Sequence, residues 1–178
     1  METISGSINQ NNSDKPVEIK IELPTNAYFM SGIRDFTLSL IENMTDFSSQ
    51  WAYRFQSVVD ELANNAIEHG SSANDKILVT FFAIANKEIK IVVEDHGHPE
   101  KPMKAEQVMA QMEKNKNKDK SEFSIRGRGL AFIVDKWTDK LEITDRPSGG
   151  LRIAVTKYLN DENFKTSDRS DDPKNIII

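Results

Sequence analysis

The sequence predicts an α+β fold, a two-layer sandwich in which helices pack on one face of a mixed, mainly antiparallel sheet. The elements expected along the chain follow the order β-α-α-β-β-loop-α-β-β, so strands outnumber the helical crossovers that a parallel sheet would need. Two central strands are separated only by the short turn "ANK", which makes them an antiparallel pair. Apolar residues make up 38% of the chain, so a packed core can form.

The first part of the chain predicts one strand followed by two helices. Residues 17–23 (VEIKIEL) alternate apolar and polar side chains, as in a half-buried strand, and Pro24 ends the pattern. Apolar residues then recur at helical spacing from Tyr28 to Ile41. The stretch "DFSSQ" offers an N-cap for a second helix over roughly 49–69.

The second part predicts four strands, with helices between the second and the third. Residues 77–84 and 88–95 are apolar-rich runs typical of strands. A long Lys-rich segment, 96–125, follows and contains a helix expected near 105–114. The remaining expected elements are a helix over 129–137 and strands over 140–144 and 149–158.

The composition favours a cytoplasmic protein. The 178 residues include no cysteine, which excludes disulfides, Cys-based zinc sites and thiol nucleophiles. A net charge of −5 and a pI of about 5.3 argue against direct binding of nucleic acid or of an anionic membrane. No apolar run approaches the ~20 residues of a membrane helix, and no signal peptide is visible. One domain is expected at 16–159, between a disordered N-terminal segment, 1–15, and a flexible tail, 160–178.

The stretch "ELANNAIEHG" is too polar for a helix that only packs, and its adjacent asparagines are poor helix formers. A helical wheel places Glu61 and Asn65 one turn apart on one flank of the apolar stripe, whereas Asn64 points nearly away from it. A carboxylate and an amide oxygen there can order a water, a hydroxyl or a hard cation such as Mg²⁺. The alternative is a solvated helix flank with a capping network near Gly70. His69 projects into the apolar stripe and is expected to be packed and hydrogen-bonded.

The second motif, "VVEDHG", ends an apolar strand with Asp95 and places Gly97 two residues later. A carboxylate at a strand end can accept a hydrogen bond from an exocyclic amine, and a nearby glycine lets a flat ring approach the backbone. The alternative interpretation is an ordinary turn, because the same residues are common there.

The third motif, "IRGRGL", opens a helix. Gly127 and Gly129 allow backbone N–H groups to curl around an anion, with the positive end of the helix behind them. Arg126 and Arg128 add cations for phosphate oxygens. The motif is neither a Walker A loop nor a Rossmann fingerprint. A flexible hinge with solvated arginines is the alternative.

The order of these motifs resembles the ATP site of the Bergerat (GHKL) fold, which gyrase, Hsp90, histidine-kinase and MutL ATPase domains share. Within that fold, the stretches "NNAIEHG", "DHGHPEKP", "GRGLAFIVDKWTDKLEI" and "GGLRIAVTK" are similar to the anti-sigma-factor serine/threonine kinases of bacterial partner-switching systems. The resemblance covers about residues 17–158.

The resemblance implies a role for each matching position. Glu61 matches the glutamate that acts as general base, and Asn65 matches the asparagine that holds Mg²⁺. Asp95 matches the carboxylate that reads the adenine amine, with Gly97 as its companion.

Gly127 and Gly129 match the second glycine box, and the segment 98–126 matches the ATP lid. The chain departs from the family pattern in two places. His98 and Pro99 follow the first glycine box, where a glycine or small residue is usual. Leu151 stands where the family has a threonine, which removes a hydroxyl at the adenine end.

The resemblance implies an ATP- and Mg²⁺-dependent serine/threonine kinase that acts as an anti-sigma factor. Its expected partners are a sigma factor and a small STAS-type anti-sigma-factor antagonist, which it phosphorylates, and the family suggests a homodimer. A histidine-kinase catalytic domain is a rival, but residues 1–27 contain no histidine that could accept the phosphoryl group. A second rival is a non-catalytic module that binds a nucleotide and sequesters a partner protein.

Overall fold

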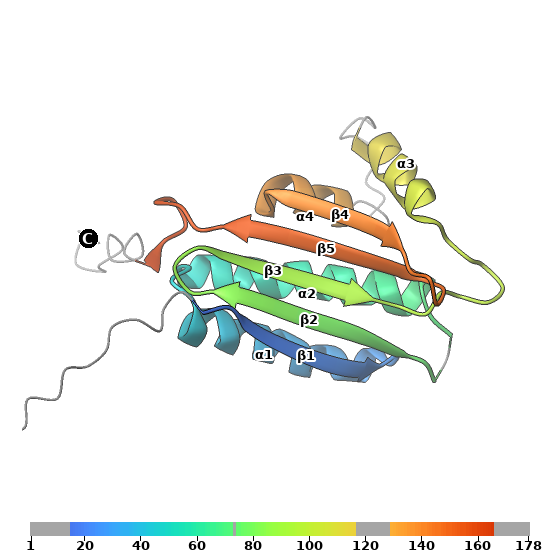
Figure 1. The fold of residues 1–178 in the computed structure, drawn as a ribbon, viewed down its shortest axis with the longest axis horizontal. Coiled ribbons are helices and arrows are strands. Elements are labelled where there is room, and N and C mark those ends of the chain that lie inside the picture. The colour runs from blue at the N-terminus through green and yellow to red at the C-terminus, as the bar shows by residue number, and fades with distance from the viewer. Residues whose placement is uncertain (1–14, 73, 117–128, 166–178) are drawn as a thin grey trace, which may run out of the picture.

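The structure is a computed structural model that describes residues 15–72, 74–116 and 129–165. Its strands are β1 (Val17–Pro24), β2 (Lys76–Ile84), β3 (Glu88–Glu94), β4 (Lys140–Asp145) and β5 (Leu151–Tyr158). Its helices are the 3-10 helix η1 (Ala27–Phe29), α1 (Met30–Met44), α2 (Ser49–His69), α3 (Ala105–Lys116) and α4 (Gly129–Trp137). The strands form one layer, and α1, α2 and α4 cover one face of it (Figure 1). Within the described ranges, no helix has the length and apolar composition of a membrane span.

The sheet has the strand order β1-β2-β3-β5-β4, and all four neighbouring pairs are antiparallel. The α+β class and the two-layer arrangement predicted from the sequence are therefore confirmed, with antiparallel pairing throughout. The register of β3 and β5 pairs Glu94 with Arg152. This register brings the residue after β3 beside the first residue of β5, although the two are far apart in the sequence.

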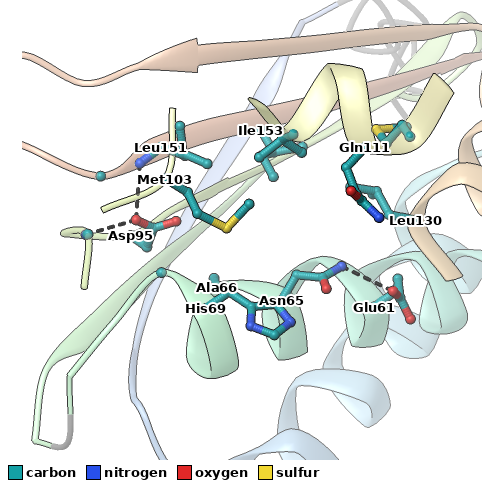
Figure 2. A pocket seen from close by; sticks show the side chains of 15 residues that line it. Glu61, Asn65, Ala66, His69, Asp95, Met103, Gln111, Leu130, Leu151 and Ile153 are labelled. Atoms are coloured by element: carbon teal, nitrogen blue, oxygen red, sulfur yellow. Dashed lines mark hydrogen bonds between the residues drawn. The ribbon is translucent and has the colours of Figure 1, made fainter. Parts of the chain in front are cut away.

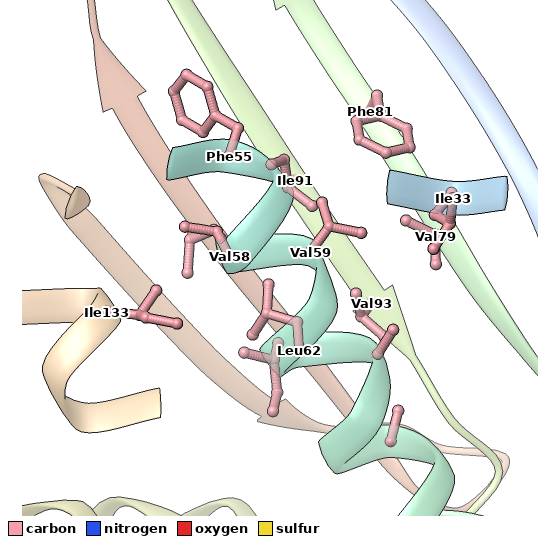
Figure 3. Packing of buried hydrophobic residues seen from close by; sticks show 14 of the residues in the cluster. Ile33, Phe55, Val58, Val59, Leu62, Val79, Phe81, Ile91, Val93 and Ile133 are labelled. Atoms are coloured by element: carbon pink, nitrogen blue, oxygen red, sulfur yellow. The ribbon is translucent and has the colours of Figure 1, made fainter. Parts of the chain in front are cut away.

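The hydrophobic core lies between the sheet and the helices, and α2 runs through its centre. Val58, Val59 and Leu62 of α2 are fully buried. Figure 3 shows these side chains between β3 and α4, with Val59 near Val93 and Val58 near Ile133. Burying a side chain of this size contributes about 1.5–3 kcal/mol. Because this face of α2 is packed on both sides, the polar flank next to it has a fixed direction.

Residues 160–165 are not the solvated tail that the sequence predicts. Phe164 forms a β-bridge with Phe47 at the junction between α1 and α2. The backbone N–H of Ser48 donates to the carbonyl of Asn163 at 2.8 Å. The polar composition of this segment hides the packing, because its contacts are with a part of the chain more than 100 residues away. Its backbone groups thus complete the loop between the first two helices.

Residue 73 and three longer ranges lie outside the described residues: 1–14, 117–128 and 166–178. The expected disorder of the N-terminal segment, the later part of the expected ATP lid and the rest of the expected tail fall there and stay predictions.

Asn163→Ala is expected to lower the free energy of unfolding by about 1–3 kcal/mol, because it removes the two hydrogen bonds that this buried side chain makes. Asn163 is 1% exposed; its Nδ2 donates to the Tyr158 carbonyl at 3.0 Å, and its Oδ1 accepts from the Asn160 N–H at 2.7 Å. Urea denaturation measures the loss, with the exposed neighbour Glu162→Ala as the control. Equal stability of the two variants would show that this segment contributes nothing to the fold.

Candidate functional site

A cavity of about 320 Å³ opens between α2, α3 and the neighbouring ends of β3 and β5 (Figure 2). Its volume is at the lower end of the range for sites that bind small molecules. Most of the lining is apolar. The apolar side chains are Ala66, Met103, Val108, Met112, Leu130, Leu151 and Ile153. Polar groups gather at the two ends of the cavity, where Asp95 and Glu61 lie.

Asp95 forms one end of the cavity and is only 4% exposed. It follows directly after β3, as the sequence predicts. Its Oδ1 accepts the backbone N–H of Gly97 at 2.9 Å and that of Leu151 at 3.0 Å. Among the described residues, no hydrogen bond reaches the second oxygen, Oδ2. The site therefore presents a fixed carboxylate with one acceptor atom available to a ligand.

Burial raises the pKa of the Asp95 carboxyl above its ordinary value. The N–H bonds from Leu151 and Gly97 and the nearby Arg146 and His96 oppose this effect without reversing it. The ionised carboxylate is therefore short of stabilising partners within the protein. A ligand that donates a hydrogen bond to Oδ2 supplies one.

Two glycines, Gly70 and Gly150, lie so close to Asp95 that neither position has room for a side chain, and Gly97 packs in the same way against the backbone of Gly150. A Cβ on Gly70, at the end of α2, would overlap the Asp95 carboxylate. A Cβ on Gly150 would overlap the Asp95 carbonyl oxygen, and Gly150 and Gly97 both have positive φ values, +80° and +81°. Sequence reasoning treated Gly70 as part of a helix cap and missed its contact with the carboxylate. The only local signal was its place directly after the polar helix.

Glu61 and Asn65 form the other end of the cavity, on the flank of α2 that the helical wheel selected. The Asn65 Nδ2 donates to the Glu61 Oε1 at 3.0 Å, and both residues are half-buried. A Cβ on Gly129, the first residue of α4, would overlap the Glu61 carboxylate. The structure thus brings Glu61, Asn65 and Gly129 together. Asn64 is absent from the cavity wall, as expected.

The spacing along α2 sets the distance between the two ends. Gly70, the residue directly after α2 that touches Asp95, follows Glu61 by nine residues, about 14 Å at 1.5 Å per residue. Figure 2 shows Asp95 and Glu61 at opposite ends, with Ala66 and Asn65 between them. This span is comparable with the length of a nucleoside triphosphate from the base to the terminal phosphate.

Helix α3, which lies within the segment 98–126 that the resemblance matches to the ATP lid, supplies one wall of the cavity. Val108, Gln111 and Met112 of α3 line the cavity, and Met103 lies just before the helix. Leu151, one of the two departures from the family pattern, has a buried side chain that lines the cavity from β5. Its backbone N–H still reaches Asp95, so the missing threonine hydroxyl does not disturb the carboxylate's position.

His69 is not packed in the core, contrary to the expectation. Its side chain is 61% exposed, lies 3.9 Å from the Glu68 carboxylate and lines the cavity. The wheel gave the direction of the side chain correctly. The wheel could not show that the last turn of α2 lines the cavity and is not covered by the sheet.

The donor set near Glu61 fits Mg²⁺ only together with a ligand. Within the described ranges, no group of three or more His, Asp or Glu side chains could hold a metal ion. A divalent cation beside Glu61 and Asn65 would take its other ligands from phosphate oxygens and water, which is the mode that Mg²⁺ favours. The remaining predicted phosphate-binding residues, Arg126, Gly127 and Arg128, lie outside the described residues.

Comparison with known proteins places the chain among ATPase domains. Residues 23–157 match the model of the histidine kinase-like ATPase domain. The serine-protein kinase RsbW of Staphylococcus aureus strains MSSA476 and MW2 is 27% identical over 152 residues, which is 84% of this chain and 91% of the relative. The RsbW of strain JH9 is 26% identical with the same coverage. The matched range contains both ends of the cavity, and the resemblance found in the sequence motifs is confirmed.

Gly70→Ala is expected to weaken ADP binding at least as much as a change to the carboxylate itself, because the new methyl group would displace Asp95. The φ of Gly70 is −102°, so alanine fits the backbone and the effect is confined to the contact. The matched control is Gly32→Ala in α1, where nothing lies within 4 Å of the added Cβ. Calorimetric titration with ADP measures both. Unaltered ADP affinity in Gly70→Ala would contradict the placement of a base beside Asp95.

Asp95→Asn is expected to lower ADP affinity about tenfold to hundredfold, since a hydrogen bond to a charged group is worth about 1.5–3 kcal/mol. The amide keeps an oxygen for Gly97 and Leu151 and presents an N–H donor where Oδ2 accepted. Calorimetry on the folded variant is the measurement. Full affinity would remove Asp95 from base recognition.

The difference in stability between Asp95→Asn and the wild type should depend on pH, in a direction set by the raised pKa of Asp95. The stability contributed by a group with a raised pKa is present below its unfolded pKa and is lost as pH rises through its folded pKa. Asparagine does not ionise, so Asp95→Asn should be at least as stable as the wild type near pH 7. Thermal denaturation should show this advantage shrinking toward pH 4. An advantage that grows with acid would contradict the shift.

Proposed function

Because the chain belongs to the histidine kinase-like ATPase domain family, we propose that it binds MgATP in this cavity and phosphorylates a serine or threonine of a partner protein. The observation that carries the proposal is the pairing of a buried carboxylate at one end with a Glu–Asn pair at the other, about one nucleotide length away along α2. Similarity to the serine-protein kinase RsbW supports the choice of acceptor.

The adenine ring would lie between the apolar walls, with its exocyclic amine donating to Asp95 Oδ2. Gly70 and Gly150 leave the carboxylate uncovered, so the edge of the ring can reach it. Leu151 and Met112 are both buried and line the cavity, where they offer apolar contact to the faces of the ring. The triphosphate would then extend along α2 toward Glu61.

Glu61 is proposed as the general base. The acceptor oxygen bonds to the γ-phosphorus as the bond from that phosphorus to the β–γ bridging oxygen breaks. ADP leaves with the electron pair, and the hydroxyl proton passes to the Glu61 carboxylate. The Asn65 Nδ2, 3.0 Å from Glu61 Oε1, fixes the direction of that carboxylate. Gly129 supports it from the other side, at the start of α4.

Asn65 is the proposed protein ligand of Mg²⁺, through its amide oxygen. The ion would supply charge neutralisation for the phosphate oxygens. Asn65 contributes whether or not the ion is present, because its nitrogen still orients Glu61.

The proposed physiological role follows the resemblance to the partner-switching kinases. In that role the protein restrains a sigma factor in the cytoplasm and phosphorylates a small STAS-type anti-sigma-factor antagonist. Incubation with labelled ATP and candidate antagonist proteins tests the transfer directly. Binding of ATP without transfer to any of them would favour the non-catalytic nucleotide-binding module.

Glu61→Ala is expected to separate catalysis from binding. The loss of a general base typically lowers a rate ~10²–10⁴-fold. ADP affinity and thermal midpoint should stay close to wild type, because Glu61 lies away from both the base and the core. Asn65→Ala should differ, since it should also weaken the Mg²⁺-dependent part of nucleotide binding.

Phosphate transfer and ATP affinity are measured on the same preparation, with Asn64→Ala as the control. Asn64 is half-buried on the same helix but does not line the cavity. Transfer at the normal rate by Glu61→Ala would show that the helix is a binding element and not a catalytic one.

A further inference from the structure

The turn between β4 and β5 brings a cation to the Asp95 end of the cavity. The Arg146 N–H donates to the Gly150 carbonyl at 3.0 Å, and the Gly149 N–H donates back to the Arg146 carbonyl at 3.0 Å. These bonds close the turn on itself. The Arg146 side chain leaves this closed turn and crosses to the end of β3.

Arg146 contacts two consecutive residues of that strand end. One guanidinium nitrogen, Nη1, donates to the backbone carbonyl of Asp95. The Nε lies 3.4 Å from Oε1 of Glu94, and the Arg146 and Glu94 side chains are only 21% and 22% exposed. The planar fork of arginine allows both contacts at once, which a single ammonium group cannot reproduce.

The hydrogen bond from Arg146 to the Asp95 carbonyl takes the place of a backbone hydrogen bond from the sheet. Asp95 lies just beyond β3, and its N–H still donates to the Leu151 carbonyl at 3.1 Å. The Asp95 carbonyl lies beyond the last paired residues of β3 and β5, and it accepts a hydrogen bond from Arg146 instead. The backbone of Asp95 is therefore held on one side by β5 and on the other by the guanidinium. Among the described residues, Oδ2 is the Asp95 atom that accepts no hydrogen bond and can therefore accept one from a ligand.

We propose that Arg146 is a positioning residue that sets the base selectivity of the site by fixing the Asp95 peptide unit. The inference rests on the proposed function, in which Asp95 reads the exocyclic amine of adenine. Arg146 does not line the cavity, so it acts through Asp95 and does not touch the nucleotide. A base that carries a 6-oxo group in place of the 6-amino group gains nothing from a well-placed Oδ2. Its binding should be indifferent to Arg146.

The test compares ADP with IDP, which has a 6-oxo base and the same diphosphate. Calorimetric titration of the full chain gives both dissociation constants for the wild type, Arg146→Gln and Arg146→Lys. The wild type should prefer ADP. Arg146→Gln should lose about tenfold in ADP affinity and little in IDP affinity, so that the preference collapses. Arg146→Lys keeps the charge without the fork and should lose most of the preference while staying folded.

Arg152→Gln is the matched control, because it removes the same charge from the residue that pairs with Glu94 in β5. Its neighbours Leu151 and Ile153 face the cavity, so Arg152 projects to the other face of the sheet. It should retain the ADP preference.

Three outcomes would overturn the inference. An equal loss of ADP and IDP affinity in both Arg146 variants would show a general structural role. An unchanged ADP preference would show that Asp95 is positioned without Arg146. A wild-type chain that binds neither nucleotide would overturn the proposed function as well, which distinguishes that failure from the other two.

Discussion

The buried Asp95 carboxylate, held where β3 ends beside β5, is the interaction on which the rest of the site depends. One oxygen accepts two backbone N–H groups, from Gly97 and Leu151, and this fixes the other oxygen toward the cavity. The arrangement requires the antiparallel register of β3 and β5, because the two donors come from segments far apart in the sequence. It also requires glycine at position 70, where any side chain would occupy the space of the carboxylate.

Helix α2 couples this interaction to the opposite end of the cavity. Its apolar face, with Val58 and Leu62, is buried against the sheet and α4, and so the helix cannot rotate without disrupting the core. Its polar flank carries Glu61 and Asn65 at one end of the cavity, and its last residue leads into Gly70 at the other end of the cavity. The hydrophobic packing that stabilises the fold thereby also sets the distance and the direction between the groups proposed to hold the base and the terminal phosphate.

The sequence was sufficient for the features that depend on local pattern. The strand end at Asp95 and the (i, i+4) pair of Glu61 and Asn65 follow from periodicities of two and 3.6 residues, and both are where the sequence predicts them. Features that depend on distant contacts escaped. The exposure of His69 depends on where the sheet stops covering α2. The contact of Arg146 with the Asp95 carbonyl depends on the turn between β4 and β5. Neither this contact nor the exposure of His69 is indicated by the residues next to it in the sequence.

The central claim is that the cavity holds an adenine nucleotide with its base at Asp95 and its terminal phosphate at Glu61. A crystal structure of the chain with Mg²⁺ and a non-hydrolysable ATP analogue tests it most directly. The account predicts the exocyclic amine within hydrogen-bonding distance of Asp95 Oδ2, and the γ-phosphate and the ion beside Glu61 and Asn65. A nucleotide bound in the reverse direction, or outside this cavity, would contradict it.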